Sequence, residues 1–113
     1  MLDFSVKGKW AAVALDGEFD IAAGNEVPRA VAELVGRGVT DFALDVGRVT
    51  FMDCAGAGQL MAAADLVPSG RVIVVGARGS LARMFRVTGI DQVLAIFDHP
   101  AAAPSPGAAG PNP

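Results

Sequence analysis

The residues with the most distinctive chemistry in this sequence lie in one short stretch, from Asp53 to Gly58. A carboxylate and a thiol precede two glycines there, where an apolar run gives way to small and apolar residues at helical spacing. Asp53 is suited to cap a helix, because its carboxylate can accept a hydrogen bond from a free N–H group of the first turn. A plain N-cap contributes about 1 kcal/mol, and the same carboxylate could also contact a partner.

Cys54 follows directly and is the only cysteine of the chain, which excludes an internal disulfide and a cysteine metal cluster. A thiol at a helix start can be activated and act as a redox sensor. The interpretation that we favour is simpler: a small apolar side chain, half-buried behind the loop.

Gly56 and Gly58 weaken the first helical turn and therefore need an explanation of their own. Glycine allows another backbone or a partner to approach closely. A phosphate-binding dinucleotide fingerprint would require a third glycine at position 61, which is Met61. We therefore expect close packing or the approach of a partner at these glycines, and no bound cofactor.

Patterns typical of catalysis are missing from the sequence. His99 is the only histidine, and it stands where the fold is expected to end, without a serine, cysteine or aspartate constellation. There is no G-x-S-x-G, P-loop or H-E-x-x-H motif. The sequence predicts a protein that is not an enzyme and binds no metal.

The composition is typical of one compact domain without a strongly charged surface. The 113 residues are 52% apolar and carry a net charge of −3, with nine Lys and Arg scattered along the chain. No basic run could follow a nucleic-acid backbone. The first residues do not form a signal peptide, and no apolar run approaches the roughly 20 residues of a membrane helix. We expect a cytoplasmic protein that neither binds nucleic acid directly nor inserts into a membrane.

The folded domain is expected to span residues 1–99. From Pro100 the composition changes abruptly to Ala, Pro, Gly and Ser. Such a segment cannot bury enough apolar surface to offset the entropy of ordering it. Residues 100–113 are therefore predicted to be a disordered tail without a readable motif.

Strand and helix patterns alternate along the domain and predict an α/β fold. Strands are expected at 4–6, 10–15, 42–46, 71–75 and 93–97, and helical stripes over about 27–35, 55–64 and 81–87. A polar loop is expected at 16–20 and a connector at 47–50, while Ser80 is expected to cap the third helix. The alternation implies a mixed, mostly parallel β-sheet, and Gly8 makes the first two strands an antiparallel hairpin.

Four segments together resemble the STAS domain family, of the anti-sigma-factor antagonist (anti-anti-sigma factor) type. The longest runs from Leu44 to Gly58 and reads LDVGRVTFMDCAGAG. The others, in matching order, are Gly17–Asp20, Val72–Val75 and Leu81–Asp91. No single motif decides the resemblance, but four in order are specific, and together they cover nearly all of residues 3–98.

The resemblance implies a single STAS-like domain, with helices packed mainly on one face of the sheet, that binds and does not catalyse. In the family, the antagonist docks onto an anti-sigma factor, usually a serine kinase with a histidine-kinase-like ATP fold, and thereby frees a sigma factor for transcription. The loop that ends at Asp20 matches one that lies beside the start of the central helix and contacts the partner. The partner-binding positions implied here are Asp20, Asp53, Cys54, Ala55, Gly56 and Gly58.

The sequence departs from the family pattern at the phosphoacceptor position. In the family, a kinase phosphorylates a Ser or Thr two residues after the motif's aspartate, and the added charge disrupts docking. That position is Ala55 here, which has no hydroxyl. Thr50 lies before Asp53, and Ser80 and Thr88 belong to the next helix. The resemblance therefore implies binding that phosphorylation at this position does not switch.

Two other roles of STAS proteins remain open at this point. Free-standing STAS proteins also serve as accessory subunits of bacterial lipid-transport ABC systems, or as scaffold subunits of large stress-sensing assemblies. The sequence does not identify the partner, the sigma factor or the pathway, and it leaves open whether the chain forms a homodimer.

Overall fold

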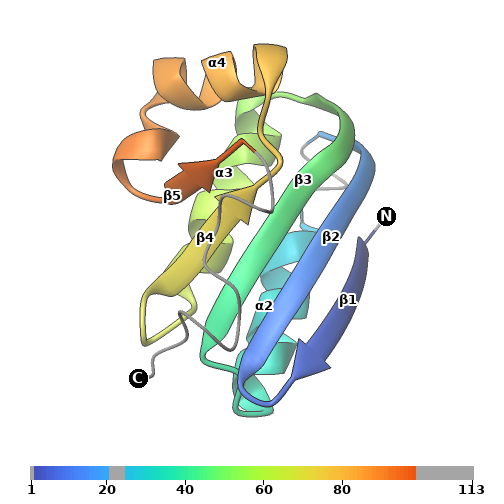
Figure 1. Cartoon of the computed structure of the whole chain (residues 1–113), viewed down its shortest axis with the longest axis vertical. Helices are drawn as coiled ribbons and strands as arrows, with labels where there is room; N and C mark the ends of the chain where they lie inside the picture. Colours follow the sequence, from blue (N-terminus) through green and yellow to red (C-terminus); the bar gives the residue numbers. More distant parts are fainter. Residues whose placement is uncertain (1, 21–24, 99–113) are drawn as a thin grey trace.

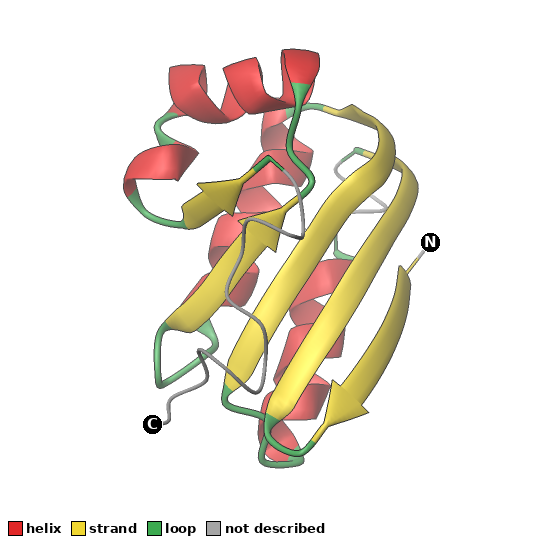
Figure 2. Ribbon diagram, viewed as in Figure 1, coloured by secondary structure: helices red, strands yellow, loops and turns green. Residues whose placement is uncertain are grey.

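The described part of the chain, residues 2–20 and 25–98, forms a five-stranded sheet and its helices in this computed structural model (Figures 1 and 2). The strands are β1 (Leu2–Lys7), β2 (Trp10–Phe19), β3 (Asp41–Met52), β4 (Arg71–Val75) and β5 (Ala95–Phe97). The helices are α2 (Glu26–Gly36), α3 (Cys54–Asp65), α4 (Gly79–Thr88) and the short 3-10 helix η1 (Ile90–Gln92). The α/β class is confirmed, whereas His99 and the expected tail at 100–113 lie outside the described residues.

The strands lie in the sheet in the same order as in the chain. β1 and β2 form an antiparallel hairpin, and Gly8 takes the left-handed conformation (φ +63°) that suits its tight turn. All other neighbouring strands are parallel, so each pair needs a helical crossover. The mixed, mostly parallel sheet with an N-terminal hairpin is thus as predicted.

α2 and α3 pack against one face of the sheet, behind the strands in Figure 1, while α4 crosses one end of the domain. The buried residues of α2 are those of its predicted apolar stripe: Val27, Val31 and Leu34. Those of α3 are Gly56, Ala57, Leu60 and Ala63. The side chains that β2 and β3 contribute to this core include Val13, Leu15, Phe42, Leu44 and Val46. The core holds α3, and with it the stretch that begins at Asp53, firmly against the sheet.

Two strands are longer than the sequence predicted. β2 continues through most of the expected loop at 16–20, and the expected connector at 47–50 lies within β3. The two extensions pair with each other, and at their ends Phe19 lies opposite Met52, with both side chains buried. The register shifts near Gly17, where φ is +92°. Such bulges break the period of two by which strands are detected in a sequence.

The C-terminal elements also differ from the prediction in detail. α4 begins at Gly79 and no side chain caps it, so the expected Ser80 cap is wrong. Val87 is 79% exposed, because only a narrow stripe of α4 that includes Phe85 contacts the core. η1 takes up the residues before the last strand, and β5 is therefore shorter than expected and leaves Val93 outside it.

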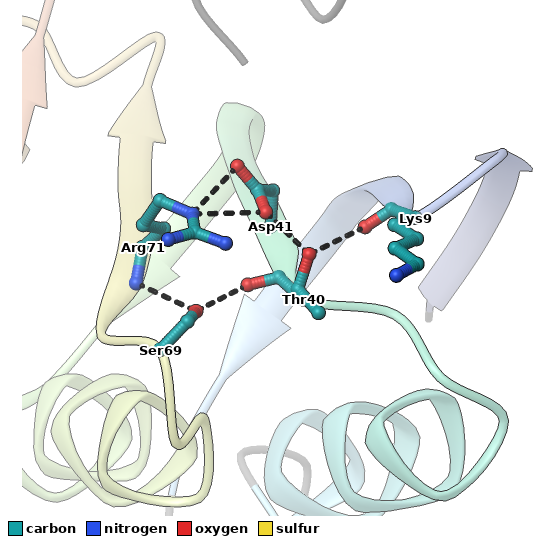
Figure 3. A network of polar contacts seen from close by, with 5 residues as sticks. All are labelled: Lys9, Thr40, Asp41, Ser69 and Arg71. Atoms are coloured by element: carbon teal, nitrogen blue, oxygen red, sulfur yellow. Dashed lines mark hydrogen bonds and ion pairs between the residues drawn. The ribbon is translucent and has the colours of Figure 1, made fainter. Parts of the chain in front are cut away.

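A polar network ties the loops together at the ends where β3 and β4 begin (Figure 3). The buried Asp41 carboxylate accepts hydrogen bonds from Thr40 Oγ1 at 2.6 Å and from Arg71 Nε at 3.1 Å to each oxygen. Ser69 Oγ donates to the Thr40 carbonyl at 2.5 Å and accepts the Arg71 N–H at 3.2 Å. The Lys9 carbonyl accepts the Thr40 N–H at 2.9 Å. This network fixes the end of the sheet opposite to Asp53.

Candidate partner-binding surface

β3 leads directly into the start of α3. After Met52, Asp53 has an extended backbone (φ −92°, ψ −179°), and the helix begins at Cys54. Asp53 Oδ1 accepts the Gly56 N–H at 2.7 Å, and the Asp53 carbonyl accepts the Ala57 N–H at 2.9 Å. The structure thus shows the predicted N-cap, with the half-buried carboxylate fixed to the first helical turn.

Gly56 packs this helix start against the end of β2. A Cβ atom at Gly56 would lie 2.0 Å from the Phe19 carbonyl oxygen and 3.2 Å from Met52 Cγ. Close packing is therefore the role of this buried glycine, which supports the surface from below. Gly58 differs from it, because the space around its Cβ position is open and the residue is exposed.

Asp20 and Asp53 lie at the same end of the sheet because β2 and β3 end in register. Phe19 and Met52 are paired residues on parallel neighbouring strands. The next residue of each strand is an aspartate, so the chain brings two carboxylates to this end. Asp20 is exposed, and its place beside the helix start is the one that the sequence resemblance implied.

Cys54, Ala55 and Gly58 form an exposed group of small residues on the first turn of α3, which we call the helix-start patch. Positions 56, 57, 60 and 63 of the helix face the core, so positions 54, 55 and 58 fall on the other side. The expectation that Cys54 is half-buried is therefore wrong, since its residue is exposed. The patch presents almost no side-chain bulk above a capped helix start.

Beyond Val75, where β4 ends, β2 and β3 continue as a two-stranded arm that curves over the end of the domain (Figure 1). A groove of about 290 Å³ lies between this arm and α4. Its lining residues are Val49, Thr50, Phe51, Met52, Arg78, Ser80, Leu81 and Met84. Phe51 is 53% exposed, so the groove offers a surface of mixed polar and apolar character that runs along β3 toward the helix-start patch.

Charges of opposite sign flank this surface. Arg78 lines the groove and is exposed. Its guanidinium group forms no hydrogen bond or ion pair with the described residues. The carboxylates of Asp20 and Asp53 lie where the arm ends. The surface therefore combines small residues, a groove with polar and apolar lining, a cation and two carboxylates. This arrangement is suited to contacting another protein.

Sequence reasoning missed the groove because it treated residues 47–50 as a connector. One signal in the sequence could have predicted a longer third strand: Val49 and Phe51 alternate with Thr50, which is a short strand pattern between Arg48 and Asp53. Arg78 falls between the strand predicted at 71–75 and the helical stripe predicted at 81–87, where the sequence predicts no element. Its position beside the arm depends on how α4 crosses the end of the sheet, which no local pattern specifies.

The described residues lack two further kinds of feature, a metal-binding cluster and a membrane-spanning helix. Within residues 2–20 and 25–98, no three His, Cys, Asp or Glu side chains are grouped so that they could hold a metal ion. In the same part of the chain, no helix has the length and apolar character needed to cross a bilayer.

The mixed five-stranded sheet and its helices match the fold of one family of domains. A family model described as "Mlab, STAS domain" matches residues 2–96. The chain belongs to the STAS domain family. The family predicted from four short segments is thereby confirmed over nearly the whole described structure. No curated protein matches the chain.

Solved structures share this STAS fold at low sequence identity. An anti-sigma factor antagonist from Mycobacterium paratuberculosis is 21% identical with a TM-score of 0.79, over 90% of this chain and 88% of that one. The antagonist SpoIIAA in its unphosphorylated form is 20% identical with a TM-score of 0.64, over 82% and 97%. A sulfate transporter family protein from Wolinella succinogenes is 19% identical with a TM-score of 0.70, over 86% and 83%. These similarities show the fold and do not choose between regulation and transport.

Proposed function

We propose that this STAS protein is an anti-sigma-factor antagonist that binds its partner through the helix-start patch and the adjoining groove. The observation that carries the proposal is the exposure of Cys54, Ala55 and Gly58 on a rigid, capped turn beside two carboxylates. Small side chains let a partner's backbone approach a helix start closely. The exposed Phe51 in the groove adds apolar area next to this contact, and the centre of a protein interface is on average more apolar than its rim.

The partner in this proposal is an anti-sigma factor of the serine-kinase type, with a histidine-kinase-like ATP fold. Binding would occupy the anti-sigma factor and so release a sigma factor for transcription. The protein acts by binding and not by catalysis, and a partner of this kind places it in the cytoplasm. Two solved antagonists with the same fold support the proposal.

Phosphorylation does not reverse this binding at the position used by the family. Ala55 is exposed at the second residue of α3, where a kinase could reach it, but it has no hydroxyl to accept a phosphate. We therefore propose a permanently binding-competent protein. Its activity would be set by its concentration, by a competing protein or by a ligand.

A second candidate function is that of an accessory subunit of a lipid-transport ABC system. The lack of a hydroxyl at Ala55 favours it, because such a subunit needs no phosphoacceptor. The description of the matching family model, "Mlab, STAS domain", does not mention an antagonist. The fold also occurs in a sulfate transporter family protein. In this case the same surface would bind the nucleotide-binding subunit of the transporter.

Affinity capture of the tagged full chain from its own host separates the two candidates. Mass spectrometry of the captured proteins should identify a small ATPase with a histidine-kinase-like fold, as the first candidate requires. Recovery of an ATPase with Walker motifs would replace the antagonist by the transport subunit. Co-elution in a particle of very high mass would instead point to a scaffold of a stress-sensing assembly.

A further inference from the structure

The two edges of the sheet differ in length. β5 is three residues long, whereas β1, at the opposite edge in Figure 1, has six residues that all pair with β2 without a register shift. In the described structure, no strand pairs with the outer side of β1. An unpaired edge strand offers a row of N–H and C=O groups to another chain, and a very short edge is one protection against this. β1 lacks that protection.

The side chains of β1 alternate between an apolar and a charged row. Phe4 lies opposite the buried Val13 in the hairpin, so Phe4 and Val6 are on the helix-bearing face of the sheet. They are nevertheless 45% and 47% exposed, because α2 and α3 do not reach over this edge. Asp3 and Lys7 occupy the open face and are also exposed.

Asp3 and Lys7 cannot pair with each other within one copy of the chain. Four residues of extended strand separate them by about 13 Å. Their direct neighbours across the hairpin are Ala14 and Trp10, which carry no charge. Neither residue forms an ion pair with another described residue.

We propose that β1 pairs antiparallel with β1 of a second copy, centred on Ser5, and joins the two sheets into one. A two-fold axis perpendicular to the sheet keeps each face on its own side, so only residues of the same face can lie opposite each other. With Ser5 on the axis, Phe4 lies opposite the partner's Val6, and Asp3 lies opposite the partner's Lys7. The two-fold symmetry repeats both pairs. Asp3 and Lys7 of each copy therefore face an opposite charge, and Phe4 and Val6 of each copy face an apolar side chain.

The charges also disfavour the two neighbouring registers. Centring the pair on Phe4 would place Asp3 opposite the partner's Ser5 and would leave Lys7 without a carboxylate. Centring it on Val6 would place Lys7 opposite the partner's Ser5 and would put Asp3 beyond the end of the partner's β1. The register centred on Ser5 is therefore the self-complementary one. It also leaves the helix-start patch and the groove open, since these lie on β3, α3 and α4, away from the β1 edge.

Charge reversal on the full chain tests this dimer by sedimentation over a wide concentration range. Asp3→Lys or Lys7→Asp places like charges opposite each other in both symmetric pairs, which should weaken self-association at least about tenfold. The double variant Asp3→Lys/Lys7→Asp exchanges the charges and should restore it. Both changed positions, 3 and 7, are exposed, and thermal melting would verify that each variant is folded.

Mixing the two single variants gives the sharpest outcome. The Asp3→Lys chain carries two lysines in β1 and the Lys7→Asp chain carries two aspartates, so every opposed pair is complementary only in the mixed dimer. We expect a heterodimer at concentrations where each variant alone is monomeric. A monomeric wild-type chain at all concentrations, or a double variant and a mixture no better than the single variants, would overturn the proposal.

Cross-linking tests the register independently, in a Cys54→Ser background. Ser5→Cys places the thiol on the two-fold axis, where Cα atoms about 4.5–5.5 Å apart suit a disulfide. Oxidation should therefore give a covalent dimer. Lys7→Cys is the matched control, because position 7 lies opposite position 3 and should stay uncross-linked. The reverse result would exclude pairing centred on Ser5.

Discussion

At the scale of single residues, two glycines of α3 that look alike in the sequence have different physical roles. Gly56 is in contact with the Phe19 carbonyl, whereas nothing lies within 4 Å of the Cβ position of Gly58. The sequence indicated that these glycines needed an explanation. The sequence could not assign a separate role to each glycine, because their roles differ according to where the end of β2 meets α3.

This difference predicts opposite effects of two alanine substitutions that are only two residues apart in α3. Gly56→Ala should lower the free energy of unfolding by about 2–3 kcal/mol, because its Cβ overlaps a backbone carbonyl that cannot move away easily. Gly58→Ala should leave it unchanged or raise it by up to about 1 kcal/mol, since alanine favours a helix. Urea unfolding of both variants measures the two values. Equal effects at the two positions would contradict the packing described for Gly56.

The missing hydroxyl at Ala55 makes a second prediction at this scale. If the partner is a serine kinase, Ala55→Ser supplies the missing acceptor at an exposed helix start, where phosphate is tolerated. We expect phosphate transfer from ATP to the variant but not to the wild-type chain, followed by release of the partner. Intact-mass measurement after incubation with the captured partner detects the transfer. Phosphate on the wild-type chain would show that another residue is the acceptor.

At the scale of elements, the sequence predicted the five strands that alternate with helical segments along the chain. It missed the two-stranded arm, which is formed by the extensions of β2 and β3. The paired extensions of β2 and β3 contain Asp16, Gly17 and Gly47 and shift register twice, so local patterns suggest loops there. What holds the arm together is long-range pairing between two segments of the chain. The groove depends on this arm, and for that reason the sequence could not predict it.

The opposite end of the sheet offers a test of how the elements are joined. Arg71→Met removes the Nε–H that bonds both oxygens of the buried Asp41, and should lower the free energy of unfolding by about 1–3 kcal/mol. Arg37→Met is the matched control, since it breaks an exposed pair with Glu33 on α2 and should cost less than about 1 kcal/mol. Urea unfolding compares them, and a similar small loss in both would mean that the network contributes little. Partner binding by folded Arg71→Met should be unchanged, because the network is far from the helix-start patch.

At the scale of the whole molecule, the sequence was sufficient to predict the family and the mixed sheet. These followed from the order of four segments and from the alternation of strand and helix patterns. Exposure could not be predicted in the same way, as Cys54 and Val87 show, because it depends on how the helices sit on the sheet. The two proposals together give the domain two separate surfaces, one at the start of α3 for a partner and one at the β1 edge for a second copy.

The central claim is that the start of α3 binds the partner, and one titration tests it most directly. Calorimetry would compare the captured partner with the wild-type chain, with Ala55→Arg in the helix-start patch, and with Ala32→Arg on α2 as a matched exposed alanine. We predict that Ala55→Arg weakens binding at least about tenfold, because a long charged side chain holds the partner off the patch. Ala32→Arg should bind like the wild type. Equal binding by all three folded chains would contradict the site proposed here.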